Sequence, residues 1–351
     1  MKKRILVAPL NWGLGHAARC IPIIKALKDY GFQPVIASDG NALLLLQKEF
    51  PELVFFELPS YNVNYAKQSR YFKLKLLSHA AKFFKAIKAE QKMVCEMVGQ
   101  NMIDGIVSDN RFGVYSAKIP SVYVTHQLHV LSGNTTWLST KMHQKCIKNF
   151  DECWIPDTAG KNNLSGKLGH AGALKMPLKH IGPLSRFEKQ NLKVVNAVLV
   201  LLSGPEPQRT LLEERLLCEL KNYHGKIVFV KGVVEKEQTA KVIENMTVYN
   251  FMTSELLEKT INESDLIIAR SGYTTIMDLA KLNKKAFFIP TPGQFEQQYL
   301  ARRLTDLNLV PSCNQGEFNL DKLEDIDGFE GLKTFGLEVD FKGLFSLFEG
   351  E

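Results

Sequence analysis

A polar turn between an apolar run and a helical pattern is the segment of this chain best suited to bind an anion. Residues 265–269 read as a buried strand, and Arg270, Ser271 and Gly272 connect it to a predicted helix over Tyr273–Leu282. The first turn of a helix has unpaired backbone N–H groups and a partial positive charge, and glycine lets an anion approach closely. Arg270 and Ser271 add side-chain donors. These features predict a diphosphate site at this turn.

Further polar residues follow at positions that suit a sugar. Asp278 stands six residues after Gly272, far enough along the predicted helix to meet a sugar hydroxyl. The next strand, over 286–289, ends in a turn rich in proline and glycine, after which Gln297 and Gln298 open another helix. Ligands of open α/β sheets bind at such carboxyl ends of strands. Each residue alone is more often a cap, a loop residue or a solvated helix residue, but their joint occurrence favours a binding site.

His16 is the leading candidate for a catalytic base. It follows the first strand, in a glycine-bearing loop at the start of a predicted helix. Its ordinary pKa of about 6.5 lets it accept a proton at cellular pH, and the positive potential of a helix start keeps the ring neutral, as a base requires. Asp109, which follows another strand on the same rim, is the rival base. His16 also fits a cap or a simple hydrogen-bonding role, and Asp109 also fits a helix cap.

The same loop matches a dinucleotide-binding pattern. Gly13, Gly15 and Ala18 satisfy G-x-G-x-x-A, and Asp39 lies about 20 residues further on. An NAD(P)-dependent oxidoreductase is therefore one alternative. Four residues separate the strand end from this pattern, which begins directly at the strand end in true fingerprints. A dehydrogenase would also leave the turn at Arg270 without a role.

The segment from 264 to 298 resembles the carboxyl-terminal half of glycosyltransferase family 28, the group of the lipid-intermediate N-acetylglucosaminyltransferases of peptidoglycan synthesis. In that family an Arg-Ser-Gly turn, an acidic residue and a Gln-Gln pair clasp a UDP-sugar. The matching residues here are Arg270, Ser271, Gly272, Asp278, Gln297 and Gln298. The family usually has glutamate at the position of Asp278. The resemblance implies a GT-B fold, in which two Rossmann-like domains face a central cleft.

The resemblance extends more weakly to other loops that face the cleft. It adds Ser203, Gly204 and Thr275 on the donor side, although the family's usual Gly-Gly-Ser is Ser-Gly-Pro in this chain. On the acceptor side it implies Gly13, Gly15, which with His16 matches a Gly-His loop end, and His126 and Gln127. The family carries a carboxylate where this chain has Gln127, and this difference predicts different acceptor contacts.

These residues imply a metal-independent, inverting transfer of a hexose or N-acetylhexosamine from a UDP-sugar to an acceptor hydroxyl, with a lipid-linked acceptor as the leading option. His126 and His129 have no carboxylate or cysteine cluster beside them, so we expect neither a metal nor a cofactor. A UDP-sugar epimerase of the same fold and a non-catalytic module that binds nucleotide-sugar are further alternatives.

Composition predicts an ordered protein with more than one domain. The chain has 351 residues, of which 45% are hydrophobic, enough for a large core. Its six cysteines lack the CxxC spacing of zinc or redox sites, so we read them as reduced thiols of a cytosolic protein. The polar residues after the first strand interrupt any signal-peptide core, and no apolar run approaches the roughly 18 residues of a membrane span. We therefore expect a cytoplasmic protein, with peripheral attachment to the inner face of the plasma membrane as an option.

Positive charge is concentrated in one stretch. The net charge is +7, and residues 64–92 contain eight lysines and arginines against Glu90 alone. Phe72, Leu76, Ala80, Phe83 and Ile87 recur there at helical spacing. Such a helix suits an anionic membrane surface, but its apolar stripe fits packing on its own domain equally well. Nucleic acid is a less favoured partner because no binding motif accompanies the basic residues.

Strand and helix patterns alternate through two halves, which predicts an α/β fold with parallel sheets. Apolar strands are expected at 5–8, 34–37, Val54–Glu57, 105–108, 122–125, Glu152–Ile155 and 180–182, and then at 197–202, 226–230, 247–250, 265–269 and 286–289. A polar bridge separates the halves. The predicted boundaries are an acceptor domain over 1–184, a linker over 185–193, a nucleotide-sugar domain over 194–335 and a tail over 336–351 with an apolar helix. The resemblance implies that this helix returns to the first domain.

Overall fold

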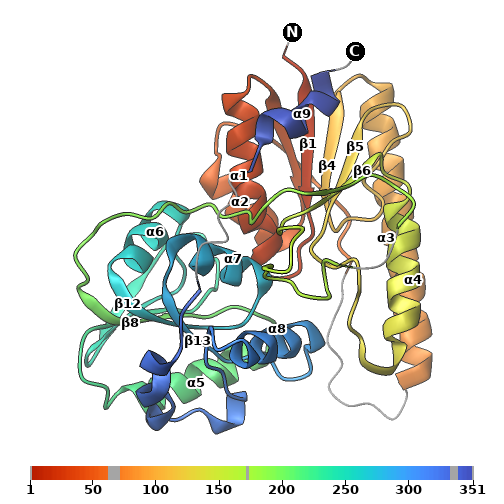
Figure 1. Ribbon diagram of the computed structural model, residues 1–351. Coiled ribbons are helices and arrows are strands. Elements are labelled where there is room, and N and C mark those ends of the chain that lie inside the picture. The colour runs from red at the N-terminus through yellow and green to blue at the C-terminus, as the bar shows by residue number, and fades with distance from the viewer. Residues whose placement is uncertain (1, 62–71, 171–173, 333–338, 350–351) are drawn as a thin grey trace.

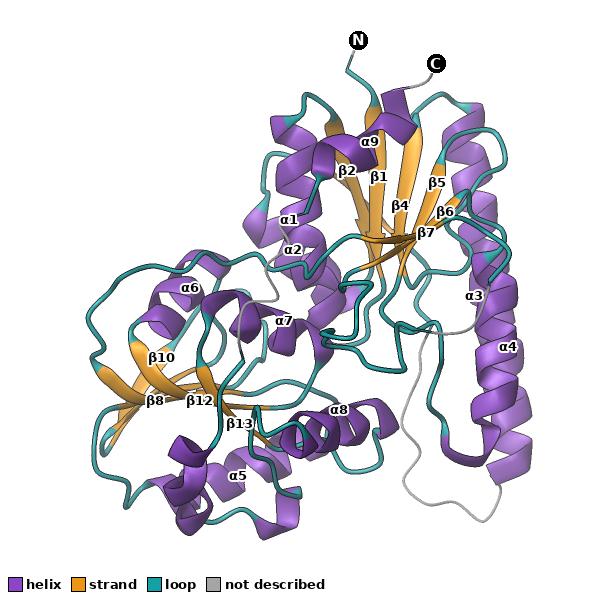
Figure 2. Cartoon of the chain, viewed as in Figure 1, coloured by secondary structure: helices purple, strands orange, loops and turns teal. Residues whose placement is uncertain are grey.

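The protein forms two α/β units side by side (Figures 1 and 2). The computed structural model describes residues 2–61, 72–170, 174–332 and 339–349, with the backbone alone described for helix residues 72–81. Each unit has one twisted sheet with helices on its faces, so the expected α/β fold with two Rossmann-like halves is confirmed.

The first sheet consists of seven parallel strands in the order β3-β2-β1-β4-β5-β6-β7. The strands are β1 (Arg4–Pro9), β2 (Gln33–Ser38), β3 (Val54–Glu57), β4 (Gly105–Asp109), β5 (Ser121–Val124), β6 (Glu152–Ile155) and β7 (Leu178–His180). Four α-helices connect them: α1 (Gly15–Asp29), α2 (Gly40–Glu49), α3 (Phe72–Gly99) and α4 (Thr136–Ile147), the last preceded by the 3-10 turn η1 (Gly133–Thr135). Strand β7 begins and ends two residues earlier than the sequence predicted.

The second sheet has the order β10-β11-β9-β8-β12-β13. Its strands are β8 (Asn196–Leu201), β9 (Ile227–Val230), β10 (Ala240–Ile243), β11 (Met246–Tyr249), β12 (Ser264–Ala269) and β13 (Lys285–Phe288). The helices are α5 (Gln208–Leu220), α6 (Ser254–Asn262), α7 (Tyr273–Leu282) and α8 (Phe295–Asp306), followed by the 3-10 segments η2 (Gln315–Glu317) and η3 (Leu320–Gly328) and by α9 (Phe341–Glu349). The sequence did not predict β10, an antiparallel edge strand, because all four of its residues are exposed and show no burial pattern.

The strand order reverses at the same place in both sheets. Strands β1 and β4 are neighbours in the first sheet, and β8 and β12 are neighbours in the second. The loops after neighbouring strands at such a point run in opposite directions and leave a crevice at the carboxyl ends. This topology puts the loop before α1, the end of β4 and the turn before α7 at the facing edges of the two sheets.

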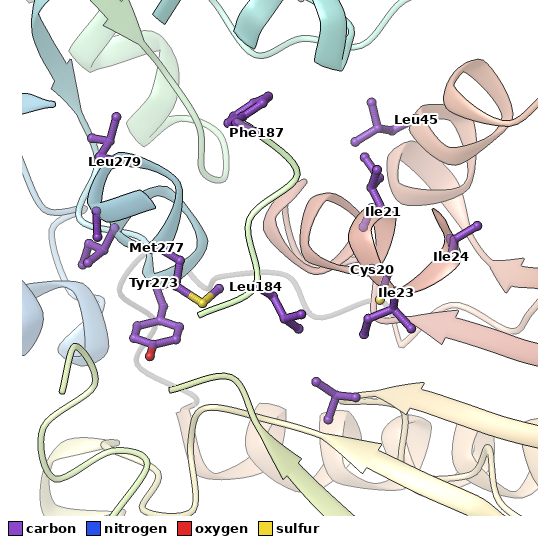
Figure 3. Packing of buried hydrophobic residues seen from close by; sticks show 14 of the residues in the cluster. Cys20, Ile21, Ile23, Ile24, Leu45, Leu184, Phe187, Tyr273, Met277 and Leu279 are labelled. Carbon is purple, nitrogen blue, oxygen red and sulfur yellow. The ribbon is translucent and has the colours of Figure 1, made fainter. Parts of the chain in front are cut away.

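The segment between the two units has two buried residues and is then exposed over 188–195. Leu184 and Phe187 are each 1% exposed, and Figure 3 shows them between helix α1 and helix α7. Nη1 of Arg186 donates to Ser254 Oγ at 3.0 Å, and the backbone N–H of Gln190 donates to Asn262 Oδ1 at 3.0 Å. Leu184 and Phe187 join the apolar core that runs through both units, whereas residues 188–193 of the predicted linker are exposed, and its bounds stay a prediction.

Helix α9 lies on the first unit, beside the amino terminus (Figure 1). Nζ of Lys3 donates to the carbonyl of Phe348 at 2.8 Å, and the rings of Phe32 and Phe345 lie 5.7 Å apart. A Cβ atom on Gly105 would stand 2.6 Å from Phe348 Cδ1. Strand β4 therefore needs glycine at its first residue to accept this helix.

Helix α3 uses its described apolar side chains within its own unit. Phe83 and Ile87 pack with Tyr61 and Phe112, whereas Lys82, Lys85, Lys88 and Lys92 are exposed. Of the predicted basic stretch, Lys67 and Arg70 lie outside the described residues. No helix in the described ranges is long and apolar enough to cross a bilayer.

Candidate active site

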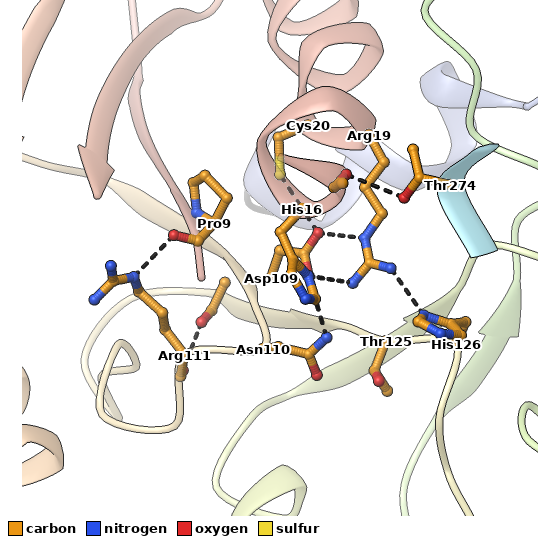
Figure 4. Close-up of polar contacts among 12 residues, drawn as sticks. Pro9, His16, Arg19, Cys20, Asp109, Asn110, Arg111, Thr125, His126 and Thr274 are labelled. Carbon is orange, nitrogen blue, oxygen red and sulfur yellow. Dashed lines mark hydrogen bonds and ion pairs between the residues drawn. The ribbon is translucent and has the colours of Figure 1, made fainter. Parts of the chain in front are cut away.

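His16 and Asp109, predicted as rival bases, form one pair. Asp109 ends β4 and is fully buried, while His16 lies in the first turn of α1. The register of β1 against β4 sets Asp109 opposite Pro9, just before the loop that carries His16. His16 Nδ1 lies 2.8 Å from Asp109 Oδ1 (Figure 4). The two residues therefore act together rather than as alternatives.

Arg19 completes this cluster, and sequence reasoning missed it. Its Nε donates to Asp109 Oδ2 at 2.5 Å, and its Nη2 contacts Oδ1 of the same carboxylate. Burial by itself would raise the pKa of Asp109, but Arg19 and His16 hold it far below its ordinary value. Asp109 therefore stays ionised and is a poor proton acceptor. The i, i+3 spacing of Arg19 from His16 on one helix face was the available signal.

The ionised carboxylate decides which nitrogen of His16 carries a proton. His16 Nδ1 lies 2.8 Å from Asp109 Oδ1 and 2.9 Å from Arg19 Nη2. Because Arg19 Nη2 already donates to Asp109, we assign the proton of Nδ1 to the bond with the ionised carboxylate. Nε2 then keeps its lone pair, and among the described residues it has no hydrogen-bond partner. Burial lowers the pKa of His16, Asp109 opposes this shift and Arg19 adds to it. The lowered pKa favours the neutral ring, the form that a general base requires.

His126 and Gln127 connect this cluster to the second unit. Arg19 Nη1 lies 2.8 Å from His126 Nδ1, and His126 Nε2 lies 2.7 Å from Glu296 Oε1 of α8. Gln127 Nε2 donates to Glu296 Oε2. The His126 ring stacks on Tyr273, with centroids 4.3 Å apart. Sequence reasoning assigned Glu296 no role, although it directly precedes the predicted Gln-Gln pair.

The starts of α1 and α7 meet across the two units. Thr274 Oγ1 donates to the carbonyl of Gly15 at 3.1 Å. A Cβ atom on Gly15 would stand 3.1 Å from Thr274 Oγ1. Gly13, with φ of 72°, has no heavy atom within 4 Å of the position a Cβ would take. Glycine at residue 15 therefore permits the close approach, and Gly13 borders open space.

Arg270 does not point toward this meeting place. It is fully buried, and its guanidinium donates to the carbonyls of Ile289, Pro290 and Gln208 and to Gln315 Oε1, at 2.7 to 3.2 Å. Burial lowers its pKa to about 10. In this conformation the guanidinium is engaged by these groups, and the direct contact with phosphate stays a prediction. Its role here is to tie together the loops that end β12 and β13.

The rest of the predicted turn has a mixed placement. Ser271 is buried and donates through Oγ to the carbonyl of Gln297 at 2.8 Å, so its hydroxyl is also engaged. Gly272 is the N-cap of α7, with extended backbone angles, and Thr275 lies in the first turn of the helix. The N–H groups of that first turn have no partners within the helix. They are the donors that this turn offers to an anion.

Asp278 faces the segment between the units. Its Oδ1 accepts from Ser185 Oγ at 2.7 Å, and it is 7% exposed. Burial raises the pKa of Asp278 to about 6, although Arg186 and Ser185 oppose the shift. The predicted ribose contact requires a carboxylate turned to the cleft, and this conformation does not provide it.

The Gln-Gln pair divides into a structural and a free residue. Gln297 is buried, and its Oε1 accepts from the backbone N–H of Thr291 at 2.8 Å. Gln298 is half-buried, and its amide makes no hydrogen bond to the described residues. Ser203 is also half-buried, and Gly204 has φ of 107°, a conformation that favours glycine. Gln298 and the turn at Ser203 and Gly204 thus stay available to a ligand.

Asp39 is engaged elsewhere. It accepts from Asn11 Nδ2 at 3.1 Å and forms an ion pair with the buried Arg111. The acidic residue of the dinucleotide pattern is therefore not free to bind a ribose, which weighs against the oxidoreductase alternative. Within the described ranges, no group of three or more His, Cys, Asp or Glu side chains is arranged to hold a metal ion.

Comparison with known proteins agrees with this geometry. Residues 206–326 match the model of the glycosyltransferase family 28 C-terminal domain. An uncharacterised glycosyltransferase of Methanopyrus kandleri is 23% identical over 310 residues, which cover 81% of this chain and 85% of the relative. The UDP-N-acetylglucosamine–N-acetylmuramyl-(pentapeptide) pyrophosphoryl-undecaprenol N-acetylglucosamine transferase of Mannheimia succiniciproducens is 38% identical over 228 residues, 61% of this chain and 59% of the relative.

The solved structures include MurG of Acinetobacter baumannii, with a TM-score of 0.54 at 16% identity over 99% of both chains. This likeness extends the agreement from the second unit to the fold of the whole chain. The matched domain contains β12, α7, β13 and α8, the elements that form one wall of the site. The chain thus contains a region, residues 206–326, that matches the C-terminal domain of glycosyltransferase family 28, within the two-domain GT-B fold.

Proposed function

We propose that this enzyme transfers a hexose or N-acetylhexosamine from a UDP-sugar to an acceptor hydroxyl, with inversion and without a metal ion. The observation that carries the proposal is the His16–Asp109 pair, which leaves Nε2 of a neutral imidazole free beside the start of α7. The relative from Mannheimia succiniciproducens is named for UDP-N-acetylglucosamine, which makes this sugar nucleotide the first donor to test.

The reaction is a single displacement at the anomeric carbon. The acceptor O–H gives its proton to His16 Nε2 as its oxygen bonds to that carbon, and the bond to the diphosphate oxygen breaks with its electron pair leaving on UDP. Attack opposite the leaving group inverts the anomeric centre. Asp109 stabilises the imidazolium that forms, and Arg19 keeps Asp109 ionised throughout.

Backbone groups are the proposed binders of the diphosphate. The N–H groups of the first turn of α7, with Gly272 before them, supply oriented donors and the positive end of a helix dipole. Ser203, Gly204 and Thr275 border the same edge, and Gln298 is the proposed contact for the sugar. Arg270 contributes by fixing the loops that carry these groups.

An acceptor linked to lipid is the finer part of the proposal. It is supported by the exposed lysines of α3, which suit an anionic headgroup surface, and by the undecaprenol in the relative's name. Gln127, bound to Glu296, differs from the family's usual carboxylate, so a different acceptor is also compatible.

A UDP-release assay tests the proposal. The purified chain is incubated with a panel of UDP-sugars, each with and without acceptors that carry a free sugar hydroxyl, and both UDP and product are measured. We expect UDP release that depends on one donor and on acceptor. Conversion of a UDP-sugar to its epimer without acceptor, or UDP binding without turnover, would overturn it.

A further inference from the structure

Glu296 is the residue of the second unit that reaches into the base cluster of the first. It lies in the first turn of α8, and its side chain is 30% exposed. Both of its oxygens are used, Oε1 by His126 and Oε2 by Gln127. We propose that Glu296 is a positioning residue that makes the strength of the catalytic base depend on closure of the two domains; this inference rests on the proposed function.

The contacts form one continuous chain from α8 to the base. Glu296 Oε1 lies 2.7 Å from His126 Nε2, His126 Nδ1 lies 2.8 Å from Arg19 Nη1, and Arg19 binds Asp109, the partner of His16. Only the link at Glu296 crosses between the units. The rest of the chain belongs to the first unit.

Protonation along this chain follows from chemistry. A guanidinium can only donate, so His126 Nδ1 must accept from Arg19 and carries no proton. The ring proton of neutral His126 is therefore on Nε2, where it needs an acceptor. Glu296 provides that acceptor, and stacking on Tyr273 of α7 holds the ring in the same orientation. The hydrogen bond to Glu296 and the stacking on Tyr273 both come from the second unit. His126 therefore loses both contacts if the two units separate.

Closure also changes the charge around the base. The groups near His16 are Asp109 on β4, Arg19 and Cys20 on α1, His126 after β5 and Glu296 on α8. In the closed arrangement two carboxylates face one guanidinium, and the extra negative charge favours an imidazolium at His16. In an open arrangement Arg19 faces Asp109 without Glu296. The base is therefore stronger when the cleft is closed.

Removal of Glu296 does not by itself remove the other contacts between the units. Tyr273 Oη donates to the carbonyl of Pro156 at 2.9 Å, Thr274 to that of Gly15, and Ser254 Oγ to Glu49 Oε1 at 2.7 Å. Glu296→Gln keeps an amide oxygen for His126, removes the charge and replaces the oxygen that accepts from Gln127. This variant separates the effect on the base from an effect on folding.

The first test needs no substrate. Histidine C2–H resonances of the ligand-free chain are titrated by NMR, with the His16 signal identified by its loss in His16→Asn. We expect the pKa of His16 to fall by roughly 0.5 unit in Glu296→Gln, because a nearby negative charge is lost. Glu255→Gln is the matched control, since Glu255 is an exposed acid in the first turn of α6. An unchanged titration in Glu296→Gln would overturn the inference.

The second test uses transfer kinetics. Glu296→Gln should lower kcat roughly tenfold and move the acidic limb of its pH profile to lower pH, with the donor KM little changed. A raised donor KM with an unmoved pH profile would show instead that Glu296 only binds the sugar. If the wild-type chain transfers no sugar, the proposed function fails, while the NMR result still decides the link between Glu296 and His16.

Discussion

At the scale of single residues, Asp109 orients the imidazole of His16, and His16 is the proposed proton acceptor. Asp109 has the more familiar base chemistry, yet Arg19 holds it ionised with a depressed pKa. His16 has one nitrogen bound and the other free. The resembling family has a carboxylate at the position of Gln127. In this chain the carboxylate of Glu296, from the other unit, accepts a hydrogen bond from Gln127. We therefore propose the histidine, and not the aspartate, as the proton acceptor.

Substitution of the base tests this division of roles. His16→Ala should lower kcat by roughly 10² to 10⁴, because general base catalysis is lost, while UDP affinity changes little. Asp109→Asn should also lower kcat, since the amide no longer fixes the tautomer of His16. UDP release and UDP titration measure the two effects. His224→Ala, at an exposed histidine, is the control, and unchanged turnover in His16→Ala would remove the assignment.

Asp278 makes a prediction about stability and pH. Its pKa in the folded chain is about 6, above the ordinary 3.8, so folding favours the protonated form. Wild-type stability should therefore fall relative to Asp278→Asn as pH rises through about 6, by up to about 3 kcal/mol between pH 4 and 8. Urea unfolding of both proteins at several pH values measures the difference. A constant difference would show that Asp278 is normally solvated.

At the scale of elements, each half of the site is made by a helix start. The loop before α1 carries His16, and the turn before α7 carries Gly272 and the free backbone donors. The side chains of Arg270 and Ser271 stabilise the turn before α7 by donating hydrogen bonds to backbone carbonyls of neighbouring segments. In this conformation Arg270 and Ser271, which were expected to contact the ligand, instead support the backbone of the turn.

Arg270 supplies the test at this scale. Arg270→Lys cannot reproduce the four hydrogen bonds to two loops and to α5, so we expect a loss of about 2 to 4 kcal/mol in the free energy of unfolding. Chemical denaturation measures that loss. UDP titration of the folded variant should show much less change than denaturation does, and a large loss of UDP affinity with full stability would restore a direct phosphate contact.

At the scale of the whole molecule, the two units share one apolar core and several polar contacts. Leu184 and Phe187 fill the space between α1 and α7, and α9 crosses back to the first unit. The domain boundaries predicted from composition remain a proposal: Leu184 and Phe187 pack between the units, and residues 188–195 are exposed. The exposed lysines of α3 lie on the first unit, where their charge is free to act on a surface.

The basic helix predicts binding to anionic membranes. Lysines near such a surface contribute about 1 kcal/mol each, so replacing Lys82, Lys85 and Lys88 with glutamine should weaken vesicle binding roughly 100-fold at low salt. Sedimentation with vesicles of phosphatidylglycerol and phosphatidylcholine measures this. The control replaces Lys221, Lys226 and Lys241, exposed lysines of the second unit. Equal binding by both triple variants would place the contact elsewhere.

The sequence alone determined the alternation of strands and helices and the loops that carry the site. Buried strands such as β1 and β12 are continuous apolar runs, and turns such as 270–272 have few compatible residue types. Both signals are local, so a single sequence contains them. The exposed strand β10 has no such signal and was missed.

Only the tertiary structure decided which polar groups are free. Arg270, Ser271 and Asp278 look available in the sequence, but carbonyls and hydroxyls from distant segments occupy them. Arg19 and Glu296 look ordinary in the sequence and stand 277 positions apart, yet both contact His126. Hydrogen bonds depend on distance in space, and a folded chain sets those distances by packing both sheets together, which no local pattern encodes.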